Sequence, residues 1–290
     1  MNIKHTPEIE VGIVSSARIR FRLDGEFRIQ GSGSVIQGEG EATFVAGKLE
    51  IRMNGARLAL EEQVLLEPLD QVHGRFTLRD VVIGIGFHWE QKEDQEFQGA
   101  LKLLPSDGEI QVVNVVSVED YLISVISSEM RGDSSPELLK AHTIISRSWL
   151  LAQIEKQENL AGSGESYELE HRTKEEYIRW YDREDHDLFH VCADDHCQRY
   201  QGTTRSHNPE VVKAVNETAG EVLEYGNRIC DARFSKCCGG VVEEFQHCWE
   251  PVDHPYLKRV EDHPDPAKVQ SGDLKVEANA GAFINKTPEA

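Results

Sequence analysis

The segment from Val118 to Gln153 constrains the fold most, because its residue spacing predicts two successive amphipathic helices with one carboxylate at their junction. In the first helix, apolar residues recur every three to four positions, the period of a half-buried helix. These residues are Tyr121, Leu122, Val125 and Ile126. Glu129 follows at the C-terminal end, before Gly132 interrupts the pattern. The junction therefore presents a single acidic side chain.

The second helix begins with clear sequence signals. Ser135 is suited to cap it, Pro136 suits the first helical position, and Glu137 lies in the first turn, where negative charge is favourable. Lys140 and Arg147 are seven residues apart, about two helical turns, so both can project from one face. Two interpretations of the junction stay open. Its carboxylate is a general acid, or it pairs with Arg147 and has no catalytic role.

These helices resemble the SpoIID/LytB family, the stage II sporulation protein D and amidase-enhancer proteins that process bacterial cell-wall glycan. The family pattern is approximately E-D-Y-L-x-G-V-V-x-x-E-M-P, a short gap, and P-x-E-A-L-K-A-Q-A-V-A-A-R-T-Y. The matching residues are Glu119, Asp120, Tyr121, Leu122, Val125, Glu129, Met130, Leu139, Lys140, Ala141 and Arg147. The chain departs from the pattern at Ser124, Arg131, His142, Ser148 and Trp149. None of these departures removes the acid or the two cations.

The resemblance continues in the expected order on both sides of the helices. Residues 97–103 look like a family strand, residues 214–223 resemble A-V-x-x-T-x-G-x-V-L, and residues 231–240 resemble a D-A-x-F-x-x-x-x-G-G loop. Residues 255–257 match a P-Y-L motif. The resemblance thus covers about residues 96–260 and implies a mixed α+β catalytic domain.

Residues 1–95 follow a different pattern from the rest of the chain. Short alternating or apolar runs are separated by Gly, Asn and Asp turns, which predicts strands and no long helix. The predicted fold class is therefore α+β, with a β-rich N-terminal domain at residues 1–95 and a SpoIID-like domain at residues 96–270. Residues 271–290 show little pattern, and we interpret them as the start of a continuation.

The resemblance implies a reaction that needs only one carboxyl group. Ordinary glycoside hydrolysis uses two carboxylates. A lytic transglycosylase needs one, because the 6-hydroxyl of N-acetylmuramic acid attacks the anomeric carbon of its own sugar. Glu129 would protonate the glycosidic oxygen and later accept the hydroxyl proton. The expected activity is cleavage between N-acetylmuramic acid and N-acetylglucosamine in peptidoglycan, with 1,6-anhydro ends.

Several further residues are expected to contact the glycan. A cation against Glu129 would stabilise the carboxylate and withhold the proton that an acid must donate, so we expect Lys140 and Arg147 to contact substrate instead. His142 replaces a family glutamine and is either a sugar contact or an ordinary helix-face histidine. The loop before the paired glycines is expected to line the groove, with Ser235, Cys237, Cys238, Gly239 and Gly240.

A second cluster of reactive side chains lies in the segment HDLFHVCADDHC. Zinc accepts histidine nitrogen and cysteine thiolate together. Some members of the family hold zinc with one histidine and two cysteines after the catalytic helices, and His186, Cys192 and Cys197 resemble those ligands most. We therefore expect a structural zinc ion, while unligated thiols or a disulfide stay open as alternatives.

Composition limits the partners of the chain. The chain has 290 residues and a formal net charge of −20, and this negative charge argues against a protein that binds the phosphate backbone of nucleic acids. No apolar run of about 18 residues predicts a membrane span. The N-terminus lacks the pattern of a secretory signal, although the resemblance implies the cell wall or periplasm.

The expected partners are peptidoglycan glycan strands and a cell-wall amidase. Two other functions stay open. One is a non-catalytic glycan-binding or amidase-stimulating module, and the other is a cysteine or zinc hydrolase of peptide or amide bonds.

Overall fold

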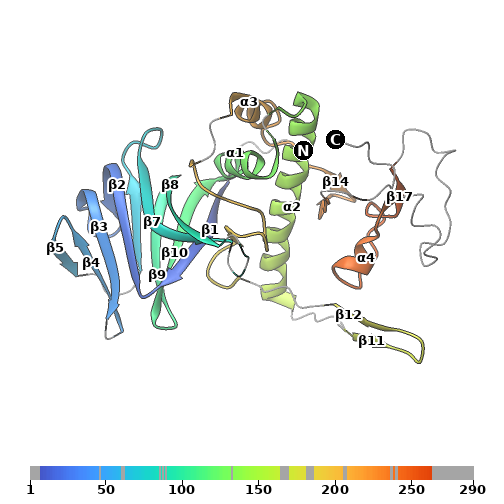
Figure 1. Ribbon diagram of the computed structural model, residues 1–290, viewed down its shortest axis with the longest axis horizontal. Helices are drawn as coiled ribbons and strands as arrows, with labels where there is room; N and C mark the ends of the chain where they lie inside the picture. The colour runs from blue at the N-terminus through green and yellow to red at the C-terminus, as the bar shows by residue number, and fades with distance from the viewer. Residues whose placement is uncertain are drawn as a thin grey trace. The chain divides into compact units, whose positions relative to one another are not determined.

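The computed structural model describes residues 7–45, 47–59, 63–84, 86, 88, 90–131, 133–163, 170–180, 186–204, 208–235, 238 and 241–262 (Figure 1). The chain divides into two compact units. The first combines residues 1–150 with 185–222, and the second combines residues 151–184 with 223–290. The predicted boundary at residue 95 is not where the chain divides, because strands on both sides of it belong to one sheet.

That sheet dominates the first unit and contains eleven of the strands in the described residues. Its strands are β1 (Glu8–Ser16), β2 (Arg18–Ile29), β3 (Val35–Val45), β4 (Lys48–Met53), β5 (Ala56–Ala59), β6 (Val64–Pro68), β7 (Arg75–Ile83), β8 (Gln91–Gln98), β9 (Ala100–Ser106), β10 (Glu109–Ser117) and β13 (Val191–Cys192). The order is β13-β1-β10-β9-β6-β2-β3-β4-β5, and β7 joins β2 to β8. The β-rich character predicted for the N-terminal region is confirmed.

Alternation of apolar and polar residues explains why these segments form strands. In β2, buried Phe21 and Leu23 alternate with outward-facing arginines, as expected for a sheet with one packed face. On neighbouring strands β7 and β8 of this sheet, the Phe76 and Phe97 rings stack at a centroid separation of 5.2 Å. The predicted single strand at residues 97–103 is instead divided by Gly99, which adopts a φ of +87°. A side chain there would collide with the β10 backbone.

Helices α1 (Val118–Glu129) and α2 (Pro136–Ser163) follow β10 directly, and α3 (Pro209–Glu217) comes later. Ser117 caps α1 by accepting a hydrogen bond from the Asp120 amide and donating one to its carboxylate. The predicted start of α2 is confirmed, since the Ser135 hydroxyl accepts from the Leu138 amide. This helix runs about ten residues beyond the predicted segment. Figure 1 shows α1 and α3 beside the N-terminal part of α2.

The second unit contains smaller elements. They are the hairpins β11 (Glu170–Arg172) with β12 (Tyr177–Arg179) and β14 (Glu224–Tyr225) with β15 (Arg228–Ile229), helix α4 (Phe245–Cys248), and the pair β16 (Val241–Val242) with β17 (Val260–Glu261). The β14–β15 hairpin turns at Gly226 and Asn227. Among the described residues, no helix combines the length and apolar character needed to cross a membrane.

Candidate active site and metal centre

Glu129 closes α1 and faces α2. Its Oε2 lies 3.0 Å from Nε2 of His142, and its Oε1 accepts a 3.4 Å hydrogen bond from the Arg199 main-chain N–H. The Glu129 side chain is 20% exposed and that of His142 is 9% exposed. A carboxyl group in this position is held by two partners yet still reaches solvent. Within the described residues, no second carboxylate is hydrogen-bonded to Glu129.

Arg147 is directed into the interior of the protein. It is 1% exposed, and its guanidinium makes a two-pronged ion pair with Glu119 at 3.0 and 2.5 Å. It also donates to the Glu221 carbonyl, while Glu119 accepts from the Gly220 amide. The predicted substrate contact for Arg147 therefore does not fit this structure, and neither does a pair between Arg147 and Glu129. The residue joins α1 and α2 to the end of α3.

Lys140 lies near the surface and pairs with Glu217 of α3 at 2.5 Å. Both side chains are more than a third exposed. A hydrogen bond from Lys140 lowers the pKa of Glu217, and the same bond raises the pKa of the Lys140 ammonium. Its ion-pair partner is Glu217 and not Glu129, and its role in binding glycan stays a prediction.

The segment Cys197–Gln201, of which the sequence singled out only Cys197, contacts both helices and completes the surroundings of Glu129. Gln198 accepts a hydrogen bond from the buried Tyr121 hydroxyl, and its own amide donates to the Ser146 carbonyl of α2. Burial, above all, raises the pKa of Tyr121 and keeps the phenol a donor. Because Arg199 lies in this segment, the position of the segment decides how the Glu129 carboxyl is held.

The same segment continues into the sheet. The Tyr200 ring stacks on Tyr121 at 5.0 Å, and its hydroxyl donates to Asn114 of β10. The main-chain N–H of Gln201 donates to the Ser124 hydroxyl of α1. Nothing in the local spacing of residues 198–201 predicts these contacts; adjacency to a predicted metal ligand was the only available signal.

The predicted metal ligands come together and gain a fourth member. Donor atoms of His186, Cys192, His196 and Cys197 all lie within 4.8 Å of one another. The Cys197 sulfur is 3.5 Å from Nε2 of His186 and 3.5 Å from Nδ1 of His196. His196 was not among the predicted ligands. His190 of the same sequence segment is not a member of this cluster, and its Nδ1 accepts a hydrogen bond from the main-chain N–H of Glu10 in β1.

Two of these separations equal those in a tetrahedral zinc site, while the Cys192 sulfur lies farther out, 3.9 Å from Nδ1 of His196. With zinc–sulfur and zinc–nitrogen bonds of about 2.3 and 2.05 Å, tetrahedral geometry separates nitrogen from sulfur by about 3.5 Å. Without a metal, a hydrogen bond with Cys197 and then burial raise the pKa of Cys192 to about 12. A divalent cation would therefore have to displace a proton from this thiol. No disulfide forms among the five cysteines that the structure describes.

The predicted groove loop belongs to the second unit. Ser235 is exposed there, and the Cys238 thiol lies 3.4 Å from an Asp262 carboxylate oxygen. Cys237, Gly239 and Gly240 lie outside the described residues. Substrate binding by this loop stays a prediction.

Comparison with known proteins points to one family. Residues 106–225 match the family model described as SpoIID, stage II sporulation protein. Stage II sporulation protein D of Bacillus subtilis (strain 168) is 27% identical over 152 residues, which are 52% of this chain and 40% of that protein. An uncharacterized protein of Brachyspira hyodysenteriae (strain ATCC 49526 / WA1) is 26% identical over 162 residues, 56% of this chain and 36% of its own length. The aligned part thus spans less than half of each relative.

Proposed function

Because residues 106–225 form a stage II sporulation protein D (SpoIID) domain, a type associated with cell-wall degradation, we propose that this chain is a peptidoglycan lytic transglycosylase. The observation that carries the proposal is the placement of Glu129. It is a partly exposed carboxyl group on the helix pair that matches the family, held by His142 and a main-chain amide. Such a group can give and take a proton without moving far.

In the proposed reaction Glu129 donates one proton and regains one by the end of the cycle. Protonated Glu129 gives its proton to the oxygen that links N-acetylmuramic acid to N-acetylglucosamine, and the bond from this oxygen to the anomeric carbon breaks. The 6-hydroxyl oxygen of the same muramic acid forms a new bond to that carbon. Glu129 then accepts the hydroxyl proton and is ready for another cycle. Neither water nor a second carboxylate is required.

The four-residue cluster supports a structural role for zinc in this function. We propose that His186, Cys192, His196 and Cys197 hold one zinc ion, which when bound would fix the start of the Cys197–Gln201 segment. Four protein donors leave no open position for a substrate, as is typical of structural sites. Glu129 would still carry out the proton transfers. The ion would hold the segment so that the Arg199 main-chain N–H contacts the Glu129 carboxyl group. This arrangement argues against a catalytic zinc hydrolase.

Glycan digestion tests the catalytic proposal. Denuded peptidoglycan strands are incubated with wild type, Glu129→Gln and the matched control Glu137→Gln, whose carboxylate is exposed on the first turn of α2. We expect 1,6-anhydro products by mass spectrometry from wild type and the control, and at least a hundredfold less from Glu129→Gln. Equal product from all three proteins would exclude Glu129 as the acid. Glycan binding without product from wild type would favour the non-catalytic or amidase-stimulating module.

A further inference from the structure

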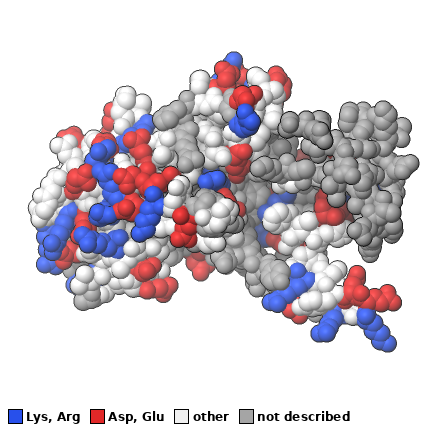
Figure 2. Space-filling view, viewed as in Figure 1, with Lys and Arg blue, Asp and Glu red and all other residues white. Residues whose placement is uncertain are grey.

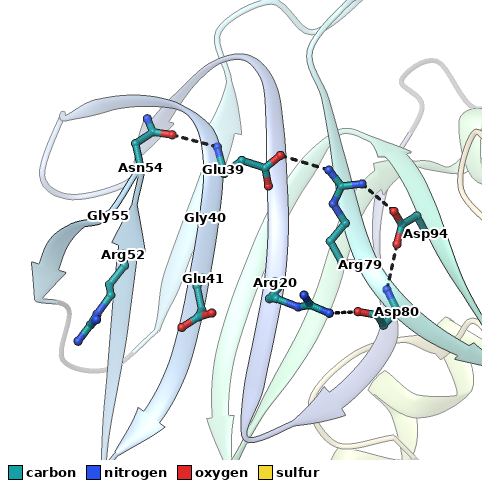
Figure 3. Close-up of a pocket in the computed structure, with 10 residues that line it drawn as sticks. All are labelled: Arg20, Glu39, Gly40, Glu41, Arg52, Asn54, Gly55, Arg79, Asp80 and Asp94. Carbon is teal, nitrogen blue, oxygen red and sulfur yellow. Dashed lines mark hydrogen bonds and ion pairs between the residues drawn. The ribbon is translucent and has the colours of Figure 1, made fainter.

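Strand β8 is bound at two points outside its pairing with β7. Near its middle, the Asp94 carboxylate accepts from Arg79 and from the Asp80 main-chain N–H, in a hollow lined by charged residues (Figure 3). Figure 2 shows charges of both signs interleaved over this face, and several of them are ion-pair partners of one another. Two residues farther along β8, Glu96 binds the chain that leads away from the Glu129 site.

Residues 202–204 hold β8 through main-chain and hydroxyl groups, and we name them the latch. The Thr203 N–H donates to the Glu96 carbonyl at 2.7 Å, and the Thr203 hydroxyl donates to the Glu96 carboxylate at 2.8 Å. In return, the Glu96 N–H donates to the Thr204 hydroxyl at 2.9 Å. Both main-chain groups of Glu96 are therefore bonded to a part of the chain that lies 107 or 108 positions away.

The close approach of the latch to β8 requires glycine at its first position. Gly202 is buried and has a φ of +59°. A Cβ there would collide with the Glu96 carbonyl oxygen and would lie 2.6 Å from the Phe97 ring. The carbonyl belongs to the backbone of a sheet, so it cannot turn aside as a flexible side chain can. Gly202 thus sets how closely the latch lies against β8.

The latch adjoins the residues that contact helix α1. The Tyr200 ring lies between the Phe97 ring of β8, at a centroid separation of 6.0 Å, and the Tyr121 ring of α1, at 5.0 Å. Next to the latch, the main-chain N–H of Gln201 donates to the Ser124 hydroxyl. A shift of the latch would therefore be passed directly to the contacts of this segment with α1.

We propose that Gly202 and Thr204 are positioning residues for Glu129, because their latch holds the Arg199 main-chain N–H against its carboxyl group. Arg199 lies two residues after Cys197 of the metal cluster and three before Gly202, so the segment has an anchor at each end. The Arg199 hydrogen bond is 3.4 Å long, near the upper limit for such bonds, and a small displacement would break it. The role assigned to Glu129 rests on the proposed function, whereas the latch does not.

Hydrogen exchange in the full chain, followed by NMR at single main-chain N–H groups, tests the latch without a substrate. Thr204→Val keeps the side-chain shape and removes the acceptor of the Glu96 N–H, whereas Thr204→Ser keeps the acceptor. We expect the Arg199 and Gln201 N–H groups to exchange about tenfold faster in Thr204→Val, the effect of losing one hydrogen bond. They should exchange at the wild-type rate in Thr204→Ser. Metal content should be equal in all three proteins.

Two glycine variants form a second matched pair. Gly202→Ala and Gly108→Ala both place a side chain at positive φ, +59° and +83°, but a Cβ at Gly108 meets no atom within 4 Å. Exchange of the Arg199 N–H should therefore rise in Gly202→Ala at least as much as in Thr204→Val, and should not change in Gly108→Ala. If Gly202→Ala does not fold, the threonine pair decides the question.

Glycan digestion supplies the catalytic measurement. Thr204→Val should lower kcat about tenfold and leave KM unchanged, because the latch holds a partner of the acid and not the sugar, and Thr204→Ser should restore kcat. Equal exchange at Arg199 in the two threonine variants would overturn the proposal, as would an unchanged kcat in Thr204→Val despite faster exchange. The exchange measurement needs no glycan. Its failure therefore leaves the Glu129 reaction standing, and a failed digestion of glycan by wild type leaves the latch standing.

Discussion

At the scale of single residues, the candidate acid is defined by its two hydrogen-bonding partners. His142 comes from the next helix, thirteen positions along the chain, and the Arg199 amide comes from seventy positions away. The family pattern places a glutamine where this chain has His142, and either side chain can offer an N–H to the carboxyl oxygen. We therefore interpret His142 as a positioning residue for Glu129, in place of the sugar contact considered from sequence.

Substitution of His142 tests this positioning role. His142→Gln keeps an N–H donor and should retain glycan cleavage within a few-fold of wild type. His142→Leu removes the donor and should lower the rate by roughly 10- to 150-fold, which corresponds to the 1.5–3 kcal/mol of a hydrogen bond to a charged group. The measurement is the initial rate of anhydro-product release, with circular dichroism to show that both variants fold. Equal rates for the two variants would contradict the role.

At the scale of elements, a buried ion pair holds the helices together. Arg147 of α2 joins Glu119 of α1, and both bind main-chain groups of the turn after α3. Both side chains also have main-chain hydrogen-bond partners. Loss of the Arg147 side chain would therefore leave the buried Glu119 carboxylate without its ion-pair partner. An arginine at this position of the family pattern can therefore stabilise the helix pair without contacting the glycan.

Replacement of Arg147 should therefore destabilise the protein. We expect Arg147→Met to reduce the free energy of unfolding by about 3–5 kcal/mol, the usual cost of breaking a buried pair. Urea denaturation followed by fluorescence measures the change. Arg131→Ala is the matched control, because Arg131 pairs with Asp133 at an 86% exposed position and should alter stability by less than about 1 kcal/mol. Similar losses in both variants would contradict the structural role of Arg147.

The metal cluster is a second connection between elements, since β13 pairs with β1 and leads into the segment beside Glu129. We expect elemental analysis to find about one zinc per chain, and a chelator to lower the unfolding temperature. Cys197→Ala and His196→Ala should each lose the metal. Cys248→Ala, at an exposed cysteine of the second unit, should keep it.

Zinc binding should also depend on pH. The pKa of unliganded Cys192 is raised to about 12, so binding must release a proton and should weaken as pH falls from 8 to 6. Full metal content in His196→Ala would limit the site to the three ligands predicted from sequence.

At the scale of the whole molecule, one sheet crosses the boundary that the sequence suggested. β1 pairs with β10 along eight positions, β6 pairs with β9, and the Phe97 ring packs on Phe76. The strands that lead into α1 and α2 therefore depend on the N-terminal strands for hydrogen bonds and for a core. In this fold residues 1–95 are an integral part of the first unit.

Truncation tests this dependence directly. A chain of residues 96–290 should not unfold cooperatively, because β9 and β10 would lose their partners and present unpaired edges. Thermal denaturation by circular dichroism, with the full chain as reference, makes the measurement. A cooperative transition near that of the full chain would mean that the predicted boundary at residue 95 separates independent domains.

The sequence by itself determined the features that depend on near neighbours. The period of apolar residues predicted α1, and the signals at Ser135 and Pro136 predicted the start of α2. Caps and helical periods arise from contacts within a few residues, so their spacing can be seen in one segment. The order of the family motifs added Glu129 as the candidate acid.

Only the tertiary structure decided how the distant parts meet. It directed Arg147 toward Glu119 and away from a substrate, brought the Arg199 amide to Glu129, and added His196 to the metal cluster. It also placed strands from residues 1–95 in the same sheet as β10, which leads directly into α1. These contacts depend on strand register and on which face of a helix is covered. Both are set by packing between segments far apart in the chain, which no local spacing encodes.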